Sequence, residues 1–289
     1  MMNRLFLVGV VLFAAGCATP PPPTPPQHNR IVVIHYYPYT VSFVRTVARP
    51  EPDYKDWDEA RMVRDLKRLS DLGVDVVMVS INPDDMHNED RTKAYIHFVD
   101  LAAKYSLNVA LMLEAHNAEA ADVVYFGLWV QESFAGRCGY LHVDGLPFIE
   151  LYDARDGDSY CDGRVFVRHT IESKEWYWSV SKEDRPGLSK NGEQAMAFAG
   201  FLVNGDKPEL GFSLSRENGE RLRRQFRAAA ATNAKFICVA SYNDFWEGHF
   251  IEPNSLDGEV PYRVLKQEIQ RLRESDHVAA VPVTAPAPL

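Results

Sequence analysis

The sequence lacks an excess of basic residues. Its 289 residues carry 31 Lys and Arg against 40 Asp and Glu, which gives a formal net charge of −9, and no basic face is evident. A nucleic-acid-binding surface needs such a face, because phosphate contacts supply most of the affinity. We therefore expect no nucleic-acid partner.

Motifs for nucleotides and structural zinc are also missing. Neither GxGxxG after the first predicted strand nor GxxxxGK[ST] occurs, and the four cysteines show no CxxC or Cys/His zinc spacing. We therefore expect no cofactor and no metal. Cys238 lies in an apolar run typical of a core thiol. Cys138 and Cys161 flank a strand-like segment and could pair in an oxidising compartment, but the sequence leaves this pairing open.

No apolar run is long enough to span a bilayer comfortably. The longest candidate, residues 5–15, follows a short positive start and ends in small residues before Cys17, which resembles a bacterial lipobox. We expect residues 1–17 to be a lipoprotein signal peptide with Cys17 as the lipidation site; an ordinary secretory signal is the alternative. Ala18 rather than Asp follows the cysteine, which favours anchoring at the outer membrane.

Proline is concentrated near the two ends of the chain. Residues 18–29 are Pro-rich and predict a stiff polyproline II tether. Residues 276–289 are rich in Ala and Pro, and we expect a disordered tail there.

Buried strands and amphipathic helices alternate over residues 30–275. This order predicts an α/β fold with a single (β/α)8 TIM barrel, irregular in its middle, and a doubly wound sheet is the runner-up. The expected strands cover residues 30–36, 74–81, 108–113, 147–152, 165–171, 175–180 and 236–240, residues 195–203 are a strand or part of a helix, and the clearest helices cover 57–72, 89–105, 118–135, 216–231 and about 262–272.

The stretch 241–253 holds the densest chemistry in the chain. It follows the buried run 236–240 and contains three carboxylates, an amide, a histidine and several aromatic rings. Asp244 and Glu247 are three residues apart, so one helical turn would place both on the same side. Cleavage of a glycosidic bond needs a carboxylic acid at the leaving oxygen and a second carboxylate, which this pair could supply. A capping or salt-bridging turn is the structural alternative.

The same stretch resembles a family signature. Asn243-Asp244-Phe245-Trp246-Glu247-Gly248-His249-Phe250-Ile251-Glu252-Pro253 is similar to the Asn-Glu-Trp-His-Glu-Gly-x-x-Ile-Glu-Pro signature of the glycoside hydrolase family 99-like proteins. These include endo-α-mannosidases and WbsX-like polysaccharide proteins and are (β/α)8 barrels. Further similarity lies in the aromatic exit 36–39, in Glu114 after the third strand, and in the Asp-Gly-x-Pro segment 144–147.

The resemblance implies roles for the two carboxylates. Glu247 would be the general acid/base at the glycosidic oxygen, and Asp244 would deprotonate the 2-hydroxyl of the sugar, which attacks in place of an enzyme nucleophile. The sequence departs from the signature at Asp244, where Asp replaces Glu and is one methylene shorter, and at Trp246, which replaces His.

Other polar and aromatic residues follow the predicted strands and should meet at the mouth of the barrel. The expected partner is an oligo- or polysaccharide, held by a monomer that is lipid-anchored in the bacterial outer membrane. The expected substrate-binding residues are Glu114, His116, His35, Tyr36, Tyr39, Asn82, Tyr242, Asn243, Trp246 and Glu252.

Two further functions remain open at this point. One is a non-catalytic carbohydrate-binding or exopolysaccharide-assembly lipoprotein on the same barrel, favoured by the Asp244 change. The other is a metal-dependent hydrolase in which His35, Glu114, His116 and His169 surround an ion.

Overall fold

The structure is a computed structural model of the whole chain. It describes residues 28–38, 46–54, 56–115, 118–152, 165–169, 171–172, 175–176, 186–189, 192–202 and 213–280. The predicted signal peptide with Cys17, most of the tether, and Cys161 lie outside the described residues, so the predictions for them stay predictions.

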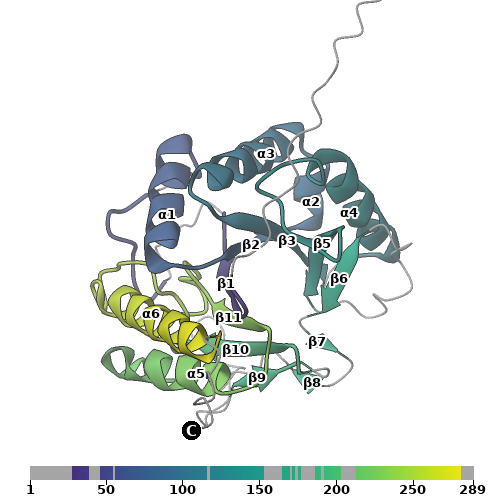
Figure 1. Ribbon diagram of the computed structural model, residues 1–289. Helices are drawn as coiled ribbons and strands as arrows, with labels where there is room; N and C mark the ends of the chain where they lie inside the picture. Colours follow the sequence, from purple (N-terminus) through teal and green to yellow (C-terminus); the bar gives the residue numbers. More distant parts are fainter. Residues whose placement is uncertain are drawn as a thin grey trace, which may run out of the picture.

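A curled sheet of nine strands forms the centre of the molecule (Figure 1). Seven strands pair in parallel in the order β6-β5-β3-β2-β1-β11-β10, while β4 joins β5 and β9 joins β10 in antiparallel fashion. The strands are β1 (Ile31–Tyr36), β2 (Val76–Ile81), β3 (Asn108–Glu114), β4 (His142–Val143), β5 (Leu146–Tyr152), β6 (Phe166–His169), β9 (Gly187–Leu188), β10 (Gln194–Phe198) and β11 (Phe236–Ala240).

The curled sheet accounts for most of the expected barrel. The described residues show no pairing between its end strands, β6 and β9, and β7 (Ile171–Glu172) and β8 (Glu175–Trp176) form a separate two-stranded sheet. The fold is therefore α/β and TIM-barrel-like, and a closed ring of eight strands is not confirmed. The predicted irregular middle corresponds to this region between β6 and β10.

Helices pack on the outside of the curl (Figure 1). Asp58 begins α1 by accepting a hydrogen bond from the backbone of Arg61, and Gly73 ends it in the left-handed conformation, as caps of these types commonly do. The helices are α1 (Glu59–Leu72), α2 (Pro83–Met86), α3 (Glu89–Lys104), α4 (Ala120–Ser133), η5 (Glu217–Gly219), α5 (Glu220–Ala230) and α6 (Val260–Ala280).

The last helix corrects one predicted boundary. Because α6 continues to Ala280, residues 276–280 of the expected tail are helical. Asp276 explains part of this extension, since it accepts a hydrogen bond from Arg30 Nε at 2.7 Å and so ties the end of α6 to the start of β1.

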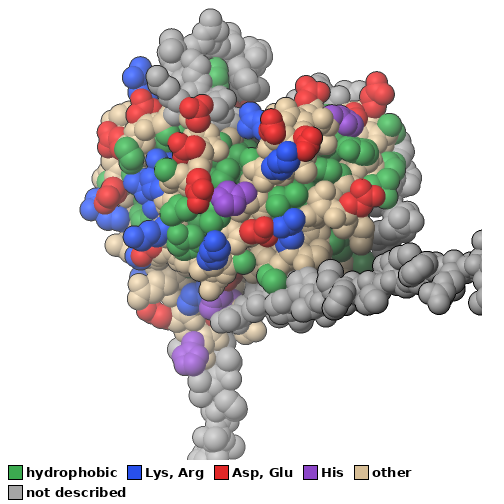
Figure 2. Space-filling model, turned by 90° about the horizontal axis from the view of Figure 1, so that it is seen from above, with side chains coloured by type: hydrophobic (Ala, Val, Ile, Leu, Met, Phe, Trp, Pro, Cys, Tyr) green, Lys and Arg blue, Asp and Glu red, His purple; other side chains and the backbone are tan. Residues whose placement is uncertain are grey.

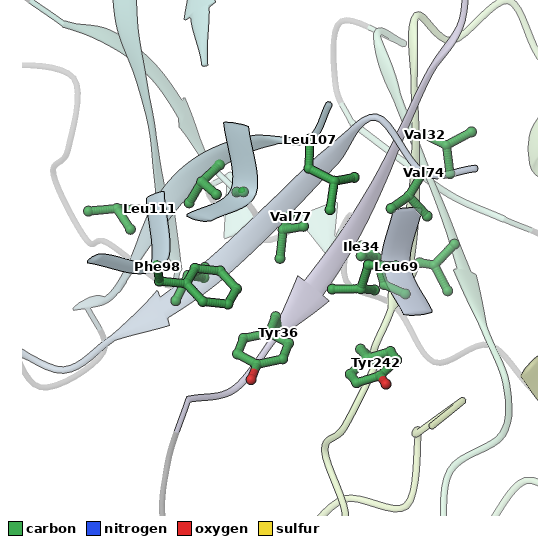
Figure 3. Close-up of a cluster of buried hydrophobic side chains, with 14 of the residues drawn as sticks. Val32, Ile34, Tyr36, Leu69, Val74, Val77, Phe98, Leu107, Leu111 and Tyr242 are labelled. Atoms are coloured by element: carbon green, nitrogen blue, oxygen red, sulfur yellow. The ribbon is translucent and has the colours of Figure 1, made fainter. Parts of the chain in front are cut away.

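Two hydrophobic cores lie on the two faces of the sheet. On β1, Val32, Ile34 and Tyr36 point outward and pack against helices, as Figure 3 shows for this cluster. Ile31 and Val33 point inward and pack against residues of the other strands. Successive side chains of a strand alternate between its faces, so this alternation decides which residues can reach the mouth of the curl.

In the described part of the chain, no helix combines the length and the apolar character needed to cross a membrane. Figure 2 shows acidic and basic side chains intermixed on one face of the molecule.

Candidate active site

The segment after β11 forms a closed turn at the carboxyl end of the sheet. Tyr242 first extends the pairing with β1, because its N–H donates to the carbonyl oxygen of His35 at 2.8 Å. The chain then leaves the sheet and returns, and the Ser241 N–H donates to the carbonyl oxygen of His249 at 2.6 Å. Residues 243–248 are thereby held at both ends at the mouth of the curl.

Asp244 fixes the shape of this turn. Its Oδ1 atom accepts hydrogen bonds from the N–H groups of Trp246 and Glu247, both at 2.9 Å, and its own N–H donates to Ser241 Oγ at 2.9 Å. Short acidic side chains suit such turns because they reach N–H groups two and three residues ahead. The capping turn, considered above as the alternative for this pair, is therefore present.

Gly248 is required where the turn passes the end of β10. It has φ of 67°, and a Cβ atom there would lie 2.6 Å from Leu202 Cβ and 2.7 Å from the Leu202 backbone nitrogen. The Leu202 N–H also donates to the carbonyl oxygen of Glu247 at 3.2 Å, so neither segment can move away without breaking this bond.

We predict that Gly248→Ala lowers the free energy of unfolding by about 1–3 kcal/mol, measured by urea unfolding. Gly258→Ala is the control, because a Cβ atom there meets nothing within 4 Å although φ is also positive, at 57°; equal losses in both variants would contradict the steric explanation.

Glu247 and His249 meet at the mouth. The Glu247 side chain is 31% exposed, whereas the His249 side chain is fully buried. His249 Nε2 lies 3.2 Å from Glu247 Oε2 and 3.4 Å from Asp244 Oδ2. The two carboxylates predicted from the sequence are therefore brought together, and a buried histidine links them.

The charges of Asp244 and His249 shift each other's pKa. Burial disfavours the charged form of His249, but the carboxylates of Asp244 and Glu247 outweigh it and raise the pKa of His249. Burial, together with the nearby charge of Glu247, raises the pKa of Asp244, although His249 and the two N–H groups on Oδ1 oppose this shift.

Glu114 adds a third carboxylate to the site. It is the last residue of β3 and lies on the same face as Met112, which points into the inner core. The hydroxyl of Ser80, from the end of β2, donates a hydrogen bond to its Oε1 atom. Burial, with the nearby charges of Asp244 and Glu247, raises the pKa of Glu114 to about 7, although the Ser80 bond opposes this shift. Glu114 therefore lies within electrostatic reach of Asp244 and Glu247, and its sugar contact stays a prediction.

Tyr37 belongs to the site, although the sequence prediction named its neighbours. The side chain of Asn243 makes two hydrogen bonds to the backbone of Tyr37. The Tyr37 N–H donates to Asn243 Oδ1, and Asn243 Nδ2 donates to the Tyr37 carbonyl oxygen, both at 2.8 Å. Burial, followed by the charges of Glu114, Asp244 and Glu247, raises the pKa of Tyr37. We therefore place Tyr37 among the three carboxylates and assign Asn243 to positioning it, which corrects the predicted sugar contact of Asn243.

Tyr36 and Tyr242 lie in the helix-facing core (Figure 3), so their predicted sugar contacts are wrong. Both are fully buried, and their rings stack with centroids 5.9 Å apart. The Tyr36 hydroxyl donates to Asp65 Oδ2 of α1 at 2.8 Å. Strand alternation explains the correction, since Tyr36 shares the outward face of β1 with Val32 and Ile34.

Glu252 is likewise misplaced in the sequence prediction. It is fully buried, its Oε2 accepts from the Tyr54 hydroxyl at 2.9 Å, and its Oε1 lies 3.3 Å from Arg64 Nη2 and 3.6 Å from Arg68 Nη1. Burial and the nearby carboxylate of Asp65 raise the pKa of Glu252 to about 8, against the effect of Arg64. Glu252 therefore ties the segment after β11 to α1 and does not face the mouth.

His35 also fails as a sugar contact. It is fully buried on the inner face of β1, and its Nε2 atom lies 4.0 Å from Glu150 Oε2. Burial lowers the pKa of His35 to about 3, and the nearby His249 contributes to this shift. His35 is therefore a neutral core residue below the site.

The remaining predicted residues divide into exposed and undescribed ones. Trp246 is 43% exposed beside Glu247, as a stacking residue would be. Asn82 is exposed after β2, and its N–H donates to Asp85 Oδ2 at 3.0 Å. His116 and Tyr39 lie outside the described residues.

Arg216 stabilises the end of the turn through hydrogen bonds, a role that the sequence does not predict. Its Nη1 atom donates to the carbonyl oxygen of Gly248 at 3.1 Å and its Nη2 atom to that of Phe250 at 2.5 Å, while Nε pairs with Asp257. The guanidinium carbon also lies 4.2 Å from the centre of the Phe250 ring. The hydrogen bonds from Arg216 to Gly248 and Phe250 span more than thirty residues of sequence, and no local motif predicts them.

A metal centre finds limited support among the described residues. Asp244, Glu247 and His249 offer donor atoms that all lie within 4.8 Å of one another. The imidazole already lies between the two carboxylates at hydrogen-bond distance, so we interpret the group as a hydrogen-bonded cluster. In the other metal hypothesis, His35 is enclosed in the core, and neither His116 nor the side chain of His169 is described.

Comparison with known proteins identifies the fold. No family model and no curated protein matches the chain. A solved GH99 endo-α-mannosidase from Bacteroides thetaiotaomicron in complex with Bis-Tris-propane matches with a TM-score of 0.71 and 16% identity, over 89% of this chain and 100% of that chain. A second structure of a GH99 endo-α-mannosidase from that organism gives a TM-score of 0.66 at 14% identity, over 84% and 98% of the two chains. A glycoside hydrolase-like protein gives 0.59 at 11% identity, over 87% and 97%. The chain therefore has a glycoside hydrolase family 99-like fold.

Proposed function

We propose that this protein is a glycoside hydrolase that cleaves an α-linked polysaccharide, with mannose as the first sugar to test. The observation that supports this most is the position of Glu247. Its partly exposed carboxyl lies at the mouth of a GH99-like fold, 3.2 Å from a buried histidine and within 4.8 Å of Asp244. The choice of an α-mannosidic linkage rests on the similarity to the two GH99 endo-α-mannosidases alone.

Glu247 would act as the general acid/base. A glycosidic oxygen leaves readily only if it receives a proton as the bond to the anomeric carbon breaks. Glu247 is accessible enough to reach that oxygen, and it lies beside the exposed ring of Trp246.

Asp244 and Glu114 would supply the remaining negative charge. The transition state of glycoside hydrolysis resembles an oxocarbenium ion, so fixed carboxylates near the anomeric carbon stabilise it. Glu114 would supply this charge above about pH 7, where its ionised form prevails.

The direct test is digestion of α-mannan and bacterial exopolysaccharides, followed by detection of new reducing ends. Hydrolysis by the wild-type protein that is lost in Glu247→Gln would support the proposal. A chelator separates the metal hypothesis, since the proposed carboxylate mechanism predicts unchanged rates with EDTA.

Trp246 gives a prediction about substrate affinity. An exposed indole beside the acid/base residue can stack on the apolar face of a sugar ring, and loss of one aromatic contact in a binding site commonly costs more than 1 kcal/mol. We expect Trp246→Ala to weaken polysaccharide binding by about tenfold, measured by affinity electrophoresis. Leu256→Ala, at another exposed apolar residue of the same segment, should bind like wild type; a Trp246→Ala variant that also binds like wild type would remove Trp246 from the site.

A second candidate function is carbohydrate binding without cleavage. The observation that favours it is the engagement of Asp244, whose Oδ1 atom holds two backbone N–H groups while Oδ2 faces His249. If the carboxylate is fully used in this way, the site could hold sugar and lack the second catalytic group. Retention of polysaccharide with no new reducing ends would support this function.

We also propose that the protein is anchored to the bacterial outer membrane by lipid on Cys17. The support is the sequence alone, namely the apolar run that ends in small residues before Cys17 and the Pro-rich tether that follows. Incorporation of labelled palmitate that disappears in Cys17→Ser tests this, and incorporation that persists would contradict it.

A further inference from the structure

A buried histidine lies between the two carboxylates at the mouth. The side chain of His249 is fully buried, packed edge-on against Phe198 and stacked on Phe201, with ring centroids 5.8 Å and 6.3 Å away. It occupies a position that the family signature leaves variable, and the proposed reaction does not yet use it. Its protonation state can be argued from its neighbours.

The Nδ1 atom of the ring faces Ser241 Oγ, which donates its hydrogen to another acceptor. Ser241 Oγ donates to the carbonyl oxygen of His249 at 3.0 Å and accepts from the Asp244 N–H at 2.9 Å. His249 Nδ1 lies 3.2 Å from this Oγ atom. When the hydroxyl proton lies on that carbonyl oxygen, the lone pairs of Oγ accept from Nδ1, which then carries a hydrogen.

The Nε2 side faces two acceptors. Glu247 Oε2 lies 3.2 Å away and Asp244 Oδ2 lies 3.4 Å away. The two N–H groups on Asp244 Oδ1 favour the ionised form of Asp244. An ionised carboxylate accepts hydrogen bonds and does not donate them, so Nε2 carries a hydrogen as well. An imidazole with hydrogens on both nitrogens is the charged imidazolium.

The charges around the ring agree with this assignment. From its own turn, Asp244 and Glu247 face it and raise its pKa against the effect of burial. From β1, His35 faces it and stays neutral, because its pKa is lowered to about 3 by burial and by His249. The core below the site therefore holds two buried histidines, of which one is charged.

We propose that His249 is a constantly charged imidazolium that positions Glu247 and sets its acidity, with Asp244 as its counter-ion. The catalytic part of this inference rests on the proposed glycosidase function. His249 is a positioning residue, since it touches Glu247 and not the substrate. By holding Oε2, it directs the proton of Glu247 onto Oε1, and it stabilises the carboxylate that forms once this proton has moved to the leaving oxygen.

The inference explains why Asp occupies position 244. One side chain must reach the N–H groups of Trp246 and Glu247 with Oδ1 and present Oδ2 to His249. Asp is short enough to do both inside a turn. Asp244 and His249 therefore form one unit, and the departure from the signature at 244 is coupled to the histidine five residues later.

The protonation state can be measured without any substrate. The full chain is labelled with 15N-histidine, and the His249 signals are identified among the nine histidines by their loss in His249→Gln. We expect both ring nitrogens to remain protonated from about pH 5 to 8, where an ordinary histidine titrates. In Asp244→Asn, an amide replaces the carboxylate, and the ring should become neutral within this range. Asp71→Asn, a surface control whose carboxylate pairs with Lys266, should leave the signals unchanged.

Two results would overturn the inference. An unprotonated Nδ1 that accepts from the Ser241 hydroxyl, or an unprotonated Nε2, would show that His249 is neutral. Unchanged His249 signals in Asp244→Asn would show that Asp244 is not its counter-ion.

The catalytic part is tested on whichever polysaccharide the wild-type protein hydrolyses. His249→Gln keeps a donor but no charge, and loss of a charged hydrogen bond should lower kcat by about 10–100-fold. Because the positive charge favours the ionised form of Glu247, its loss should move the basic limb of the pH profile to higher pH. A lower kcat with an unmoved basic limb would indicate a merely structural residue and overturn the catalytic part.

The imidazolium and the proposed function can fail separately. A charged His249 in a protein that hydrolyses no polysaccharide would refute the proposed function and support the imidazolium. Hydrolysis by a protein with a neutral His249 would support the proposed function and refute the imidazolium.

Discussion

Replacing Glu247 with glutamine is expected to lower the rate of polysaccharide hydrolysis by about 10²–10⁴-fold, the usual contribution of a general acid/base. Glutamine has nearly the same shape, and its amide cannot give a proton to the leaving oxygen. The Glu247 side chain is partly exposed, so the fold should be retained. Reducing-end assays with matched protein concentrations, together with the melting temperature of each variant, measure this prediction.

Two comparisons make the Glu247 result specific. Glu132→Gln removes an exposed carboxylate from α4 and should hydrolyse at the wild-type rate. Polysaccharide binding should persist in Glu247→Gln, because the stacking residue Trp246 is untouched. A Glu247→Gln variant that hydrolyses within a factor of two or three of wild type would show that another group donates the proton.

Removal of the Arg216 side chain is expected to give the largest loss of stability. Arg216 is 5% exposed, pairs with Asp257, and donates to the carbonyl oxygens of Gly248 and Phe250. Arg216→Met fills similar space but leaves these acceptors without their donor. Breaking a buried ion pair by removing one partner commonly costs about 3–5 kcal/mol, and we expect a loss of that size in urea unfolding.

The matched control is Arg224→Met on α5. Arg224 pairs with Glu217 at 2.8 Å, but both side chains are well exposed, at 41% and 35%. Exposed pairs contribute about 0–1 kcal/mol, because solvent screens them. If Arg216→Met and Arg224→Met lose similar small amounts of stability, the turn does not depend on the buried arginine.

Much of the fold could be predicted because its strands are strongly apolar. The run 236–240 was predicted with the bounds that the structure gives for β11, since β-branched residues in a short apolar run indicate a buried parallel strand. The segment 195–203 was left between strand and helix. It overlaps strand β10 (Gln194–Phe198), but its alanines carry little preference and only pairing with β11 decides that it is a strand.

The candidate site was predicted where chemistry lies in one short stretch. Asp244, Glu247 and Trp246 are placed by a single turn, and Glu114 by the end of one strand. Tyr37 was missed although a signal existed, because alternation along β1 puts residue 37 on the same face as Ile31 and Val33. No such signal existed for Glu252, whose partners Arg64 and Arg68 come from α1, nearly two hundred residues away. Long-range contacts of this kind are fixed by tertiary packing and leave no trace in local spacing.

The central claim is that the carboxylates at the mouth cleave a glycosidic bond. It is tested most directly by incubating the protein with a panel of α-linked polysaccharides, α-mannan included, and following the anomeric protons by NMR. The proposed function predicts new reducing-end signals that grow with time in the wild-type protein and stay absent with Glu247→Gln. Polysaccharides that bind to the protein but show no new reducing end at any pH from about 5 to 8 would contradict it and identify a protein that only holds its sugar.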